Sequence, residues 1–206
     1  MPVGPLQANC YLVSDDEGYA GAVDPGGEPE RITQILEREG LTLEAIFVTH
    51  GHFDHIDGVA GLVEATGARV YGSAAVAEAL GGAGECEVTG CPIPAVDAAM
   101  ITVVGDGAVV LMGELTSFVI ATPGHTPGDL TFEIGGHLFC GDLLFHGSVG
   151  RTDFPGGDFA QLLASVARLA SRYPRSTPVH PGHMQSTTLG EELAHNPFLG
   201  GLQVDG

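Results

Sequence analysis

Four side chains that commonly bind metal ions occur within six consecutive residues of this chain, in the run HGHFDH. They are His50, His52, Asp54 and His55. The glycine between His50 and His52 lets two imidazoles converge on one centre, while Asp54 and His55 can face a second centre about 3.5–4 Å away, the usual separation in two-metal hydrolytic sites. These ligand types suit zinc, iron or manganese. A polar turn with histidines by chance would explain a single His-x-His pair, but four such side chains favour a metal site.

Three further ligand candidates also follow predicted strands. His125, Asp142 and His183 each lie beside glycine or proline, just after an apolar run. The strands that precede the seven candidates are predicted over 45–48, 117–121, 137–140 and 177–179. Ligands of α/β proteins bind at such strand ends. A β-rich core with helices outside would therefore collect all seven side chains along one edge.

The remaining pattern predicts hairpins and amphipathic helices around this edge. Hairpins are predicted over 10–23 and 130–140, the second with the two-residue connection Gly135-Gly136. Helices are predicted from near Pro29 to Gly40, over 56–66 and 74–80, after Asp158 and over 187–195. Asp158 has Gln161 three residues further on, a variant of the capping box. Residues 81–100, rich in Gly, Ala and Pro, predict a surface excursion.

The composition excludes several classes of function. The 206 residues carry a formal net charge of −19 and include no lysine. Such a field repels phosphate backbones and anionic membrane surfaces, which argues against nucleic-acid and membrane partners. No apolar run reaches the roughly 18 residues of a membrane span, and the N-terminus does not resemble a signal peptide. We expect a single cytoplasmic domain over 1–206; the oligomeric state stays open.

The cysteines do not predict a disulfide framework. Cys10 and Cys140 lie in strand-like apolar runs, far apart in sequence. Cys86 and Cys91 are close enough in the chain to pair or to bind a metal, although two ordinary loop thiols are the simpler interpretation.

Taken in order, the motifs resemble the metallo-β-lactamase superfamily, and within it the small glyoxalase-II-like hydrolases. They are the H-x-H-x-D-H run at 50–55, TPGHTPG around His125, CGD at Asp142 and PGH at His183. The resemblance spans nearly the whole chain. It implies an α/β fold of four layers, an αββα sandwich in which two mixed β-sheets lie face to face with helices outside.

The resemblance also implies how the ligands divide between two metal ions. By analogy His50, His52 and His125 bind the first ion, Asp54, His55 and His183 bind the second, and Asp142 bridges both. We expect two Zn²⁺ per chain, with iron or manganese possible in either position.

The expected activity is thioester hydrolysis by a binuclear zinc enzyme. Two bound cations would lower the pKa of a bridging water to about 7, and the resulting hydroxide, oriented by Asp54, would attack the carbonyl. The runs GSVGRTDFPGGD at 147–158 and TTLGEE at 187–192 resemble short bacterial hydroxyacylglutathione hydrolases, so S-lactoylglutathione is the expected small-molecule substrate. Full-length glyoxalase II carries a further helical domain that binds glutathione, whereas only a short segment follows His183 in this sequence. The resemblance therefore extends to catalysis rather than to glutathione binding.

A second interpretation is an iron persulfide dioxygenase of the same fold, because those enzymes also carry a GRTDF run. By analogy they would use one iron held by His50, His125 and Asp142. The PGH setting of His183 and the TTLGEE run favour the hydrolase. Lactone hydrolysis would share the metal chemistry and differ only in the pocket. A non-catalytic metal-binding module is disfavoured because no ligand position is missing.

Two side chains are candidates for substrate binding. Arg151 can bind a carboxylate bidentately, although an arginine in a Gly-Arg-Thr-Asp turn more often braces its own loop. His146, four residues beyond Asp142, can line the pocket.

Other polar residues have weaker claims to a role at the site. Asp24 and Asp129 can fix ligand tautomers from behind, with loop capping as the equal alternative. His180 is expected to support a ligand from behind or to be structural, and not to bind metal itself, while His137 and His195 are expected to be solvated.

Overall fold

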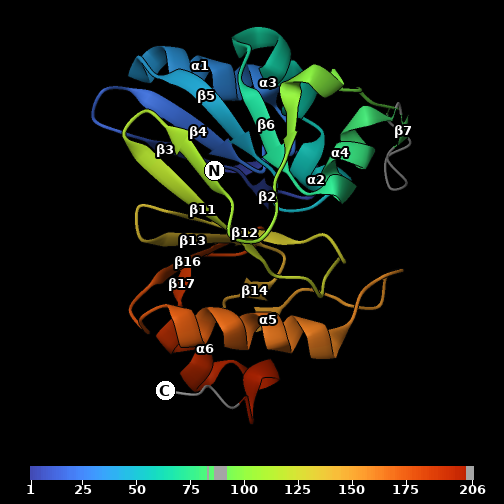
Figure 1. The fold of residues 1–206 in the computed structure, drawn as a ribbon, viewed down its shortest axis with the longest axis vertical. Coiled ribbons are helices and arrows are strands. Elements are labelled where there is room, and N and C mark those ends of the chain that lie inside the picture. The colour runs from blue at the N-terminus through green and yellow to red at the C-terminus, as the bar shows by residue number, and fades with distance from the viewer. Residues whose placement is uncertain (83, 86–91, 203–206) are drawn as a thin grey trace.

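The computed structural model describes residues 1–82, 84–85 and 92–202. It has four layers, with helices above, two β-sheets face to face in the middle, and helices below (Figure 1). This is the expected αββα architecture.

The first sheet has five strands and carries the first four ligand candidates beyond one of its central strands. In spatial order the strands are β3 (Tyr11–Ser14), β4 (Tyr19–Val23), β5 (Thr42–Phe47), β6 (Arg69–Gly72) and β9 (Ile101–Val103). β3 and β4 form the predicted antiparallel hairpin, and β4, β5, β6 and β9 run parallel. Because β4 and β5 are parallel neighbours, the residues that follow them meet at one edge.

Helices α1 (Pro29–Glu39), α3 (Val59–Thr66) and α4 (Ala74–Gly81) cover the outer face of this sheet (Figure 1). α1 begins at Pro29, where the absence of a backbone N–H costs no hydrogen bond because the first N–H groups of a helix have no partner within it. The helix ends at Gly40, which adopts a left-handed conformation at φ 68°. Ser73 caps α4 by accepting a hydrogen bond from the backbone N–H of Val76.

The helix predicted over 56–66 begins earlier than expected and is interrupted. Asp54 and His55 lie in a short helix, α2 (Phe53–Ile56), and not in an open loop, and α3 starts only at Val59. Gly58 explains the break: its backbone N–H donates to Pro25 O at 2.9 Å, and a Cβ there would meet that oxygen at 2.6 Å. The chain thus turns sharply against the loop after β4, which brings Asp54 and His55 towards Asp24.

The second sheet has six strands and carries the other three ligand candidates. In spatial order the strands are β10 (Val109–Met112), β11 (Leu115–Ala121), β12 (Leu130–Ile134), β13 (His137–Gly141), β16 (Pro178–Pro181) and β17 (Thr187–Thr188). Only β13 and β16 are parallel. Helices α5 (Phe159–Arg172) and α6 (Leu189–His195), followed by the 3-10 turn η2 (Pro197–Leu199), cover its outer face (Figure 1). Asp158 caps α5 as predicted, accepting from the N–H of Gln161 at 3.0 Å.

Shorter elements complete the described chain. They are the pairs β1 (Pro2–Val3) with β2 (Ala8–Asn9), β7 (Gly84–Glu85) with β8 (Pro92–Ile93) and β14 (Leu144–Phe145) with β15 (Ser148–Val149), and the 3-10 turn η1 (Ala98–Met100). The expected excursion over 81–100 thus contains a short hairpin and a turn. Cys86 and Cys91 lie outside the described residues. Among the helices that are described, none is both long and apolar enough to cross a membrane.

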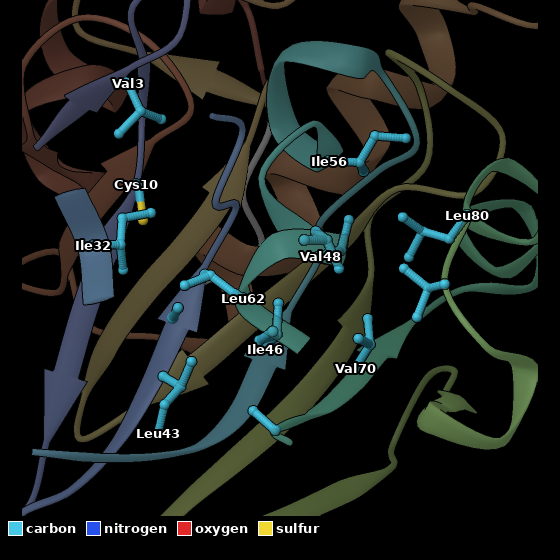
Figure 2. Close-up of a cluster of buried hydrophobic side chains, with 14 of the residues drawn as sticks. Val3, Cys10, Ile32, Leu43, Ile46, Val48, Ile56, Leu62, Val70 and Leu80 are labelled. Carbon is cyan, nitrogen blue, oxygen red and sulfur yellow. The ribbon is translucent and has the colours of Figure 1, made fainter. Parts of the chain in front are cut away.

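Three apolar clusters hold the layers together. Figure 2 shows the first, in which Ile46 and Val70 of the sheet pack with Ile32 and Leu62 of the covering helices. A second cluster, including Phe47 and Phe132, fills the space between the sheets. The third joins the second sheet to α5 and α6. Burial of these side chains is the main stabilising contribution to the sandwich, at roughly 25 cal/mol for each Å² of apolar surface.

Candidate metal centre

The first group of ligand atoms comes from the ends of two strands in different sheets. His50 and His52 follow β5, and His125 follows β11. His50 Nε2 lies 3.0 Å from His52 Nδ1, which lies 2.9 Å from His125 Nε2. Three imidazole nitrogens therefore converge on one point, as a zinc, iron or manganese ion requires.

The second group lies beside the first and combines α2 with the loop after β16. Asp54 Oδ2 is 3.2 Å from His183 Nε2 and 3.7 Å from His55 Nε2. His55 and Asp54 are buried, while His183 is partly open to solvent. Each group thus has one partly exposed histidine, His52 in the first and His183 in the second.

Asp142 lies between the two groups. Its Oδ2 is 3.7 Å from both His125 Nε2 and His183 Nε2, and its Oδ1 is 3.5 Å from His55 Nε2. Among the described residues, Asp142 Oδ1 and His55 Nε2 are buried polar atoms without a hydrogen-bond partner. Such atoms are costly to bury unless something satisfies them, and a cation would satisfy both at once. The donor set therefore fits a pair of metal ions that share Asp142.

Hydrogen bonds behind the histidines fix which ring nitrogen is free. His125 Nδ1 lies 2.7 Å from the carbonyl oxygen of Arg151, and because a carbonyl only accepts, Nδ1 carries the proton. Nε2, which faces the other candidate ligands, then carries the lone pair. This is the tautomer that a metal ligand needs.

Asp24 orients one histidine in each group. Its Oδ2 accepts from His55 Nδ1 at 2.9 Å and from Thr49 Oγ1 at 2.7 Å. Since the Thr49 hydroxyl proton is given to Asp24, its oxygen accepts from His50 Nδ1 at 3.0 Å. Asp24 lies close enough to His50 and His55 to resemble a third ligand group. It meets His55 on Nδ1, however, the nitrogen opposite the Nε2 that faces the other ligands, so it supports the ligands from behind.

Two histidines of the first group, His50 and His52, are neutral imidazoles at neutral pH. Burial, reinforced by the neighbouring histidines, lowers the pKa of His50 well below its ordinary value. Burial also lowers the pKa of His52 to about 4. Neither ring carries an additional proton at neutral pH, so both are ready to bind a cation.

The second group combines the anionic carboxylate of Asp54 with two histidines, His55 and His183, whose pKa values are raised. Burial by itself lowers the pKa of His55, but the carboxylates of Asp142 and Asp24 raise it to about 9. The hydrogen bond that His183 donates to the Asp54 carboxylate raises the pKa of His183. Burial favours protonation of Asp54, yet its pKa is lowered overall by His183 and His55. A cation binding here must displace a proton from His55, and the raised pKa of His183 strengthens the competition between protons and metal at that ring.

The Arg151 side chain is engaged within its own loop. Its guanidinium forms two 2.7 Å hydrogen bonds with Asp153 and lies 3.7 Å from the centre of the Phe154 ring. The Phe154 ring in turn meets His52 edge-on, with ring centres 6.0 Å apart. The loop thus contacts the first group through the Arg151 carbonyl and through Phe154.

His146 is joined to a buried carboxylate that the sequence did not single out. Its Nδ1 lies 3.3 Å from Glu192 Oε1, and Glu192 is 1 % exposed. The same carboxylate accepts from Thr187 Oγ1 at 2.6 Å, from the N–H of Gly147 at 2.8 Å and from Asn196 Nδ2 at 2.8 Å. The TTLGEE run had been noted only as a resemblance. Glu192 ties α6 to the turn between β14 and β15.

Asp129 and His180 have local partners. Asp129 accepts from the N–H and the hydroxyl of Thr126, the loop-capping alternative for this residue. His180 bonds to Ser186 and to His137, both at 2.8 Å, and stacks on Phe139. His180 is therefore structural, as expected, and His137 is exposed but paired with it.

Comparison with known proteins agrees with this geometry. The family model described as the metallo-beta-lactamase superfamily matches residues 3–183. The chain belongs to this superfamily. The superfamily assignment implies a metal-dependent hydrolase, and the matched range contains all seven ligand candidates.

Two curated bacterial relatives match nearly end to end. Hydroxyacylglutathione hydrolase GloC of Haemophilus influenzae is 34% identical over 203 residues, covering 97% of this chain and 96% of that protein. The probable metallo-hydrolase YqgX of Bacillus subtilis is 38% identical over 215 residues, covering 99% and 98%.

Three solved structures share the superfamily fold at substantial identity. BLEG-1, described as a B3 metallo-beta-lactamase, has a TM-score of 0.89 and 37% identity, with 98% of each chain covered. TTHA1623, solved in a di-iron-bound form, has a TM-score of 0.83 and 40% identity, covering 97% and 98%. ETHE1 from Myxococcus xanthus has a TM-score of 0.74 and 34% identity, covering 93% of this chain and 79% of that one.

Proposed function

We propose that this chain is a binuclear metal-dependent thioester hydrolase that acts on substrates such as S-lactoylglutathione. The observation that carries the proposal is the pair of ligand groups joined by Asp142, whose Oδ2 is 3.7 Å from a histidine of each group. The names of GloC as a hydroxyacylglutathione hydrolase and YqgX as a probable metallo-hydrolase support it.

The residues divide the work in the following way. His50, His52 and His125 would hold one cation, Asp54, His55 and His183 the other, and Asp142 both. When bound, the cations would activate water at neutral pH and polarise the substrate carbonyl. Asp54, kept anionic by His183 and His55, would accept a hydrogen bond from the attacking water. Asp24 would keep His55 and, through Thr49, His50 in the binding tautomer.

Zinc is the proposed metal in both positions, with iron or manganese as alternatives. Histidine and carboxylate ligands are compatible with all three. The di-iron form of TTHA1623 supports iron as a real competitor.

A second candidate is a mononuclear iron persulfide dioxygenase, favoured by the GRTDF run at 150–154, which resembles those enzymes. The 34% identity to ETHE1 from Myxococcus xanthus is compatible with this candidate. It would use His50, His125 and Asp142 only. The PGH setting of His183 and the TTLGEE run at 187–192 favour the hydrolase, whereas retention of the second group is compatible with both candidates.

The two candidates separate in one set of assays. Protein expressed in metal-replete medium is analysed for zinc, iron and manganese, then assayed for loss of S-lactoylglutathione and for oxygen uptake on glutathione persulfide. The hydrolase proposal expects about two metal ions per chain and thioester loss without oxygen uptake. One iron per chain, with oxygen uptake and no thioester loss, contradicts it. A chromogenic cephalosporin in the same panel tests the activity for which BLEG-1 is named.

A further inference from the structure

Among the residues that the structure describes, the side chains around the metal centre offer an apolar surface and no cation without a partner. Phe154 is 44% exposed while its ring contacts that of the ligand His52. Met184, directly after the ligand His183, is 59% exposed. Phe145 meets the His183 ring edge-on at 6.1 Å between ring centres. Apolar side chains thus adjoin both ligand groups.

Arg151 is the arginine whose loop contacts the metal ligands, and its charge is already matched. Asp153 binds it through two oxygens, and Phe154 covers one face of the guanidinium. A substrate carboxylate would have to replace Asp153 in this pair. Both partners of the pair are more than half exposed. Exchanging one exposed carboxylate for another yields little net binding free energy, since such pairs contribute only about 0–1 kcal/mol.

The other arginines that the structure describes do not supply a substitute. Arg31, Arg38 and Arg168 pair with Glu28, Glu39 and Asp106. Arg69 bonds to the carbonyl of Ala99, and Arg172 lies over the Tyr173 ring. Arg175 lies in the turn before β16, at the opposite end of that strand from His183. The chain has no lysine, and its net charge is −19. The described side chains of the protein therefore offer an anionic thiol such as glutathione no dedicated partner, and the net charge of the chain repels it.

We infer that the preferred substrates are thioesters of uncharged thiols, with an apolar portion that packs against Phe154 and Met184. This inference rests on the proposed thioesterase function and specifies its substrate class. Glutathione thioesters would be hydrolysed as secondary substrates, because the metal centre acts on the carbonyl whichever thiol carries it.

The test compares two thioesters with the same lactoyl group, one on glutathione and one on N-acetylcysteamine, which is uncharged. The expected kcat/KM is at least about fivefold higher for the uncharged thioester, equivalent to roughly 1 kcal/mol of transition-state binding. A higher value for the glutathione thioester overturns the inference.

Asp153→Asn tests whether the ion pair withholds Arg151. The variant is expected to raise kcat/KM for the glutathione thioester about three- to tenfold and to leave the uncharged one within twofold. No change for either substrate would show that Arg151 is not withheld. Adding Arg151→Ala to this variant should cancel the gain; if the gain persists, it came from removing a negative charge and not from freeing Arg151.

Phe154→Ala tests the apolar contact, with Phe198→Ala as the matched control. Phe198 is 48% exposed and lies in η2, near the C-terminal end of the described chain. Phe154→Ala is expected to raise KM for the uncharged thioester about five- to tenfold with kcat within twofold, while Phe198→Ala leaves both unchanged. Equal effects of the two variants would refute the contact.

The outcomes also separate this inference from the proposed function. If the glutathione thioester is the better substrate, thioester hydrolysis stands and the substrate class is wrong. If neither thioester is hydrolysed, the proposed function fails. The preference between the two thioesters is then measured by how far each one raises the Tm of the protein. A larger rise in Tm with the uncharged thioester than with the glutathione thioester then supports the inferred substrate class, and the reverse order overturns it.

Discussion

Asp24 Oδ2 and His55 Nδ1 are joined by a 2.9 Å hydrogen bond in which both side chains are fully buried. The same oxygen accepts from Thr49, which accepts from His50. One carboxylate therefore sets the tautomer of a ligand in each metal group.

Asp24→Asn should weaken metal binding at both groups. An amide in place of the carboxylate stabilises the His55 Nδ1–H and the Thr49 hydroxyl less well, and loss of such partners typically costs 10–100-fold in metal affinity. Competition with a chromogenic chelator measures the effect. Asp129→Asn is the control, because this buried carboxylate caps Thr126 and should affect stability more than metal affinity. Equal losses of affinity in the two variants would argue against the role of Asp24.

Asp142→Ala should remove more metal than His183→Ala. Asp142 adjoins both groups, whereas His183 belongs to the second alone. Elemental analysis should return about one metal ion per chain for His183→Ala and clearly less for Asp142→Ala. The same metal content in both proteins would contradict the bridging position.

The metal-free protein should lose stability as the pH rises from about 6.5 to 9. The carboxylates of Asp142 and Asp24 raise the pKa of His55 to about 9 in the folded protein. Protonated His55 therefore stabilises the fold fully below pH 6.5, and this stabilisation is lost as the pH rises through the folded-state pKa. The shift corresponds to roughly 3 kcal/mol, a fall in Tm of about 5–10 °C.

Thermal unfolding across this range, with and without metal, provides the measurement. The metal-loaded protein should not show the fall, because the cation takes the place of the proton. If both forms show parallel pH profiles, His55 is not the group responsible.

Glu192→Gln should destabilise the protein by about 1–3 kcal/mol at pH 7, because it disturbs a buried carboxylate with several donors. Burial opposes ionisation of Glu192, but hydrogen bonds from Thr187 and the Gly147 N–H lower its pKa overall. Its contribution is therefore present above pH 4.5 and lost as the pH falls through the folded value. The difference in Tm between variant and wild type should narrow below pH 4.5. Glu191→Gln, at an exposed neighbour, should change little.

That the seven candidate ligands lie together was predictable because each has a local signal, a ligand-type side chain close to glycine or proline at the end of an apolar run. The contact of Asp24 with His55 and, through Thr49, with His50 was not predictable from the sequence. It depends on the parallel pairing of β4 with β5, in which Val23 is opposite Phe47, so that residues 25 positions apart in sequence become neighbours. A single sequence does not state which strands pair, and loop capping therefore remained an equal explanation for Asp24.

The helical position of Asp54 and His55 and the role of Glu192 also depended on tertiary contacts. The break before α3 follows from the packing of Gly58 on Pro25. The spacing of apolar residues within 56–66 contains no sign of this contact. Glu192 is one of two adjacent acidic residues in α6, and only packing of α6 against the β14–β15 turn buries it.

Zinc titration of the metal-free protein, with thioester hydrolysis measured at each addition, tests the binuclear hydrolase account most directly. The account predicts that activity rises to its maximum at about two equivalents of zinc per chain, because the ligands form two groups that share Asp142. Maximal hydrolysis at one equivalent would contradict the need for both groups. No hydrolysis at any zinc level, together with oxygen uptake on glutathione persulfide after one equivalent of iron, would contradict the hydrolase itself.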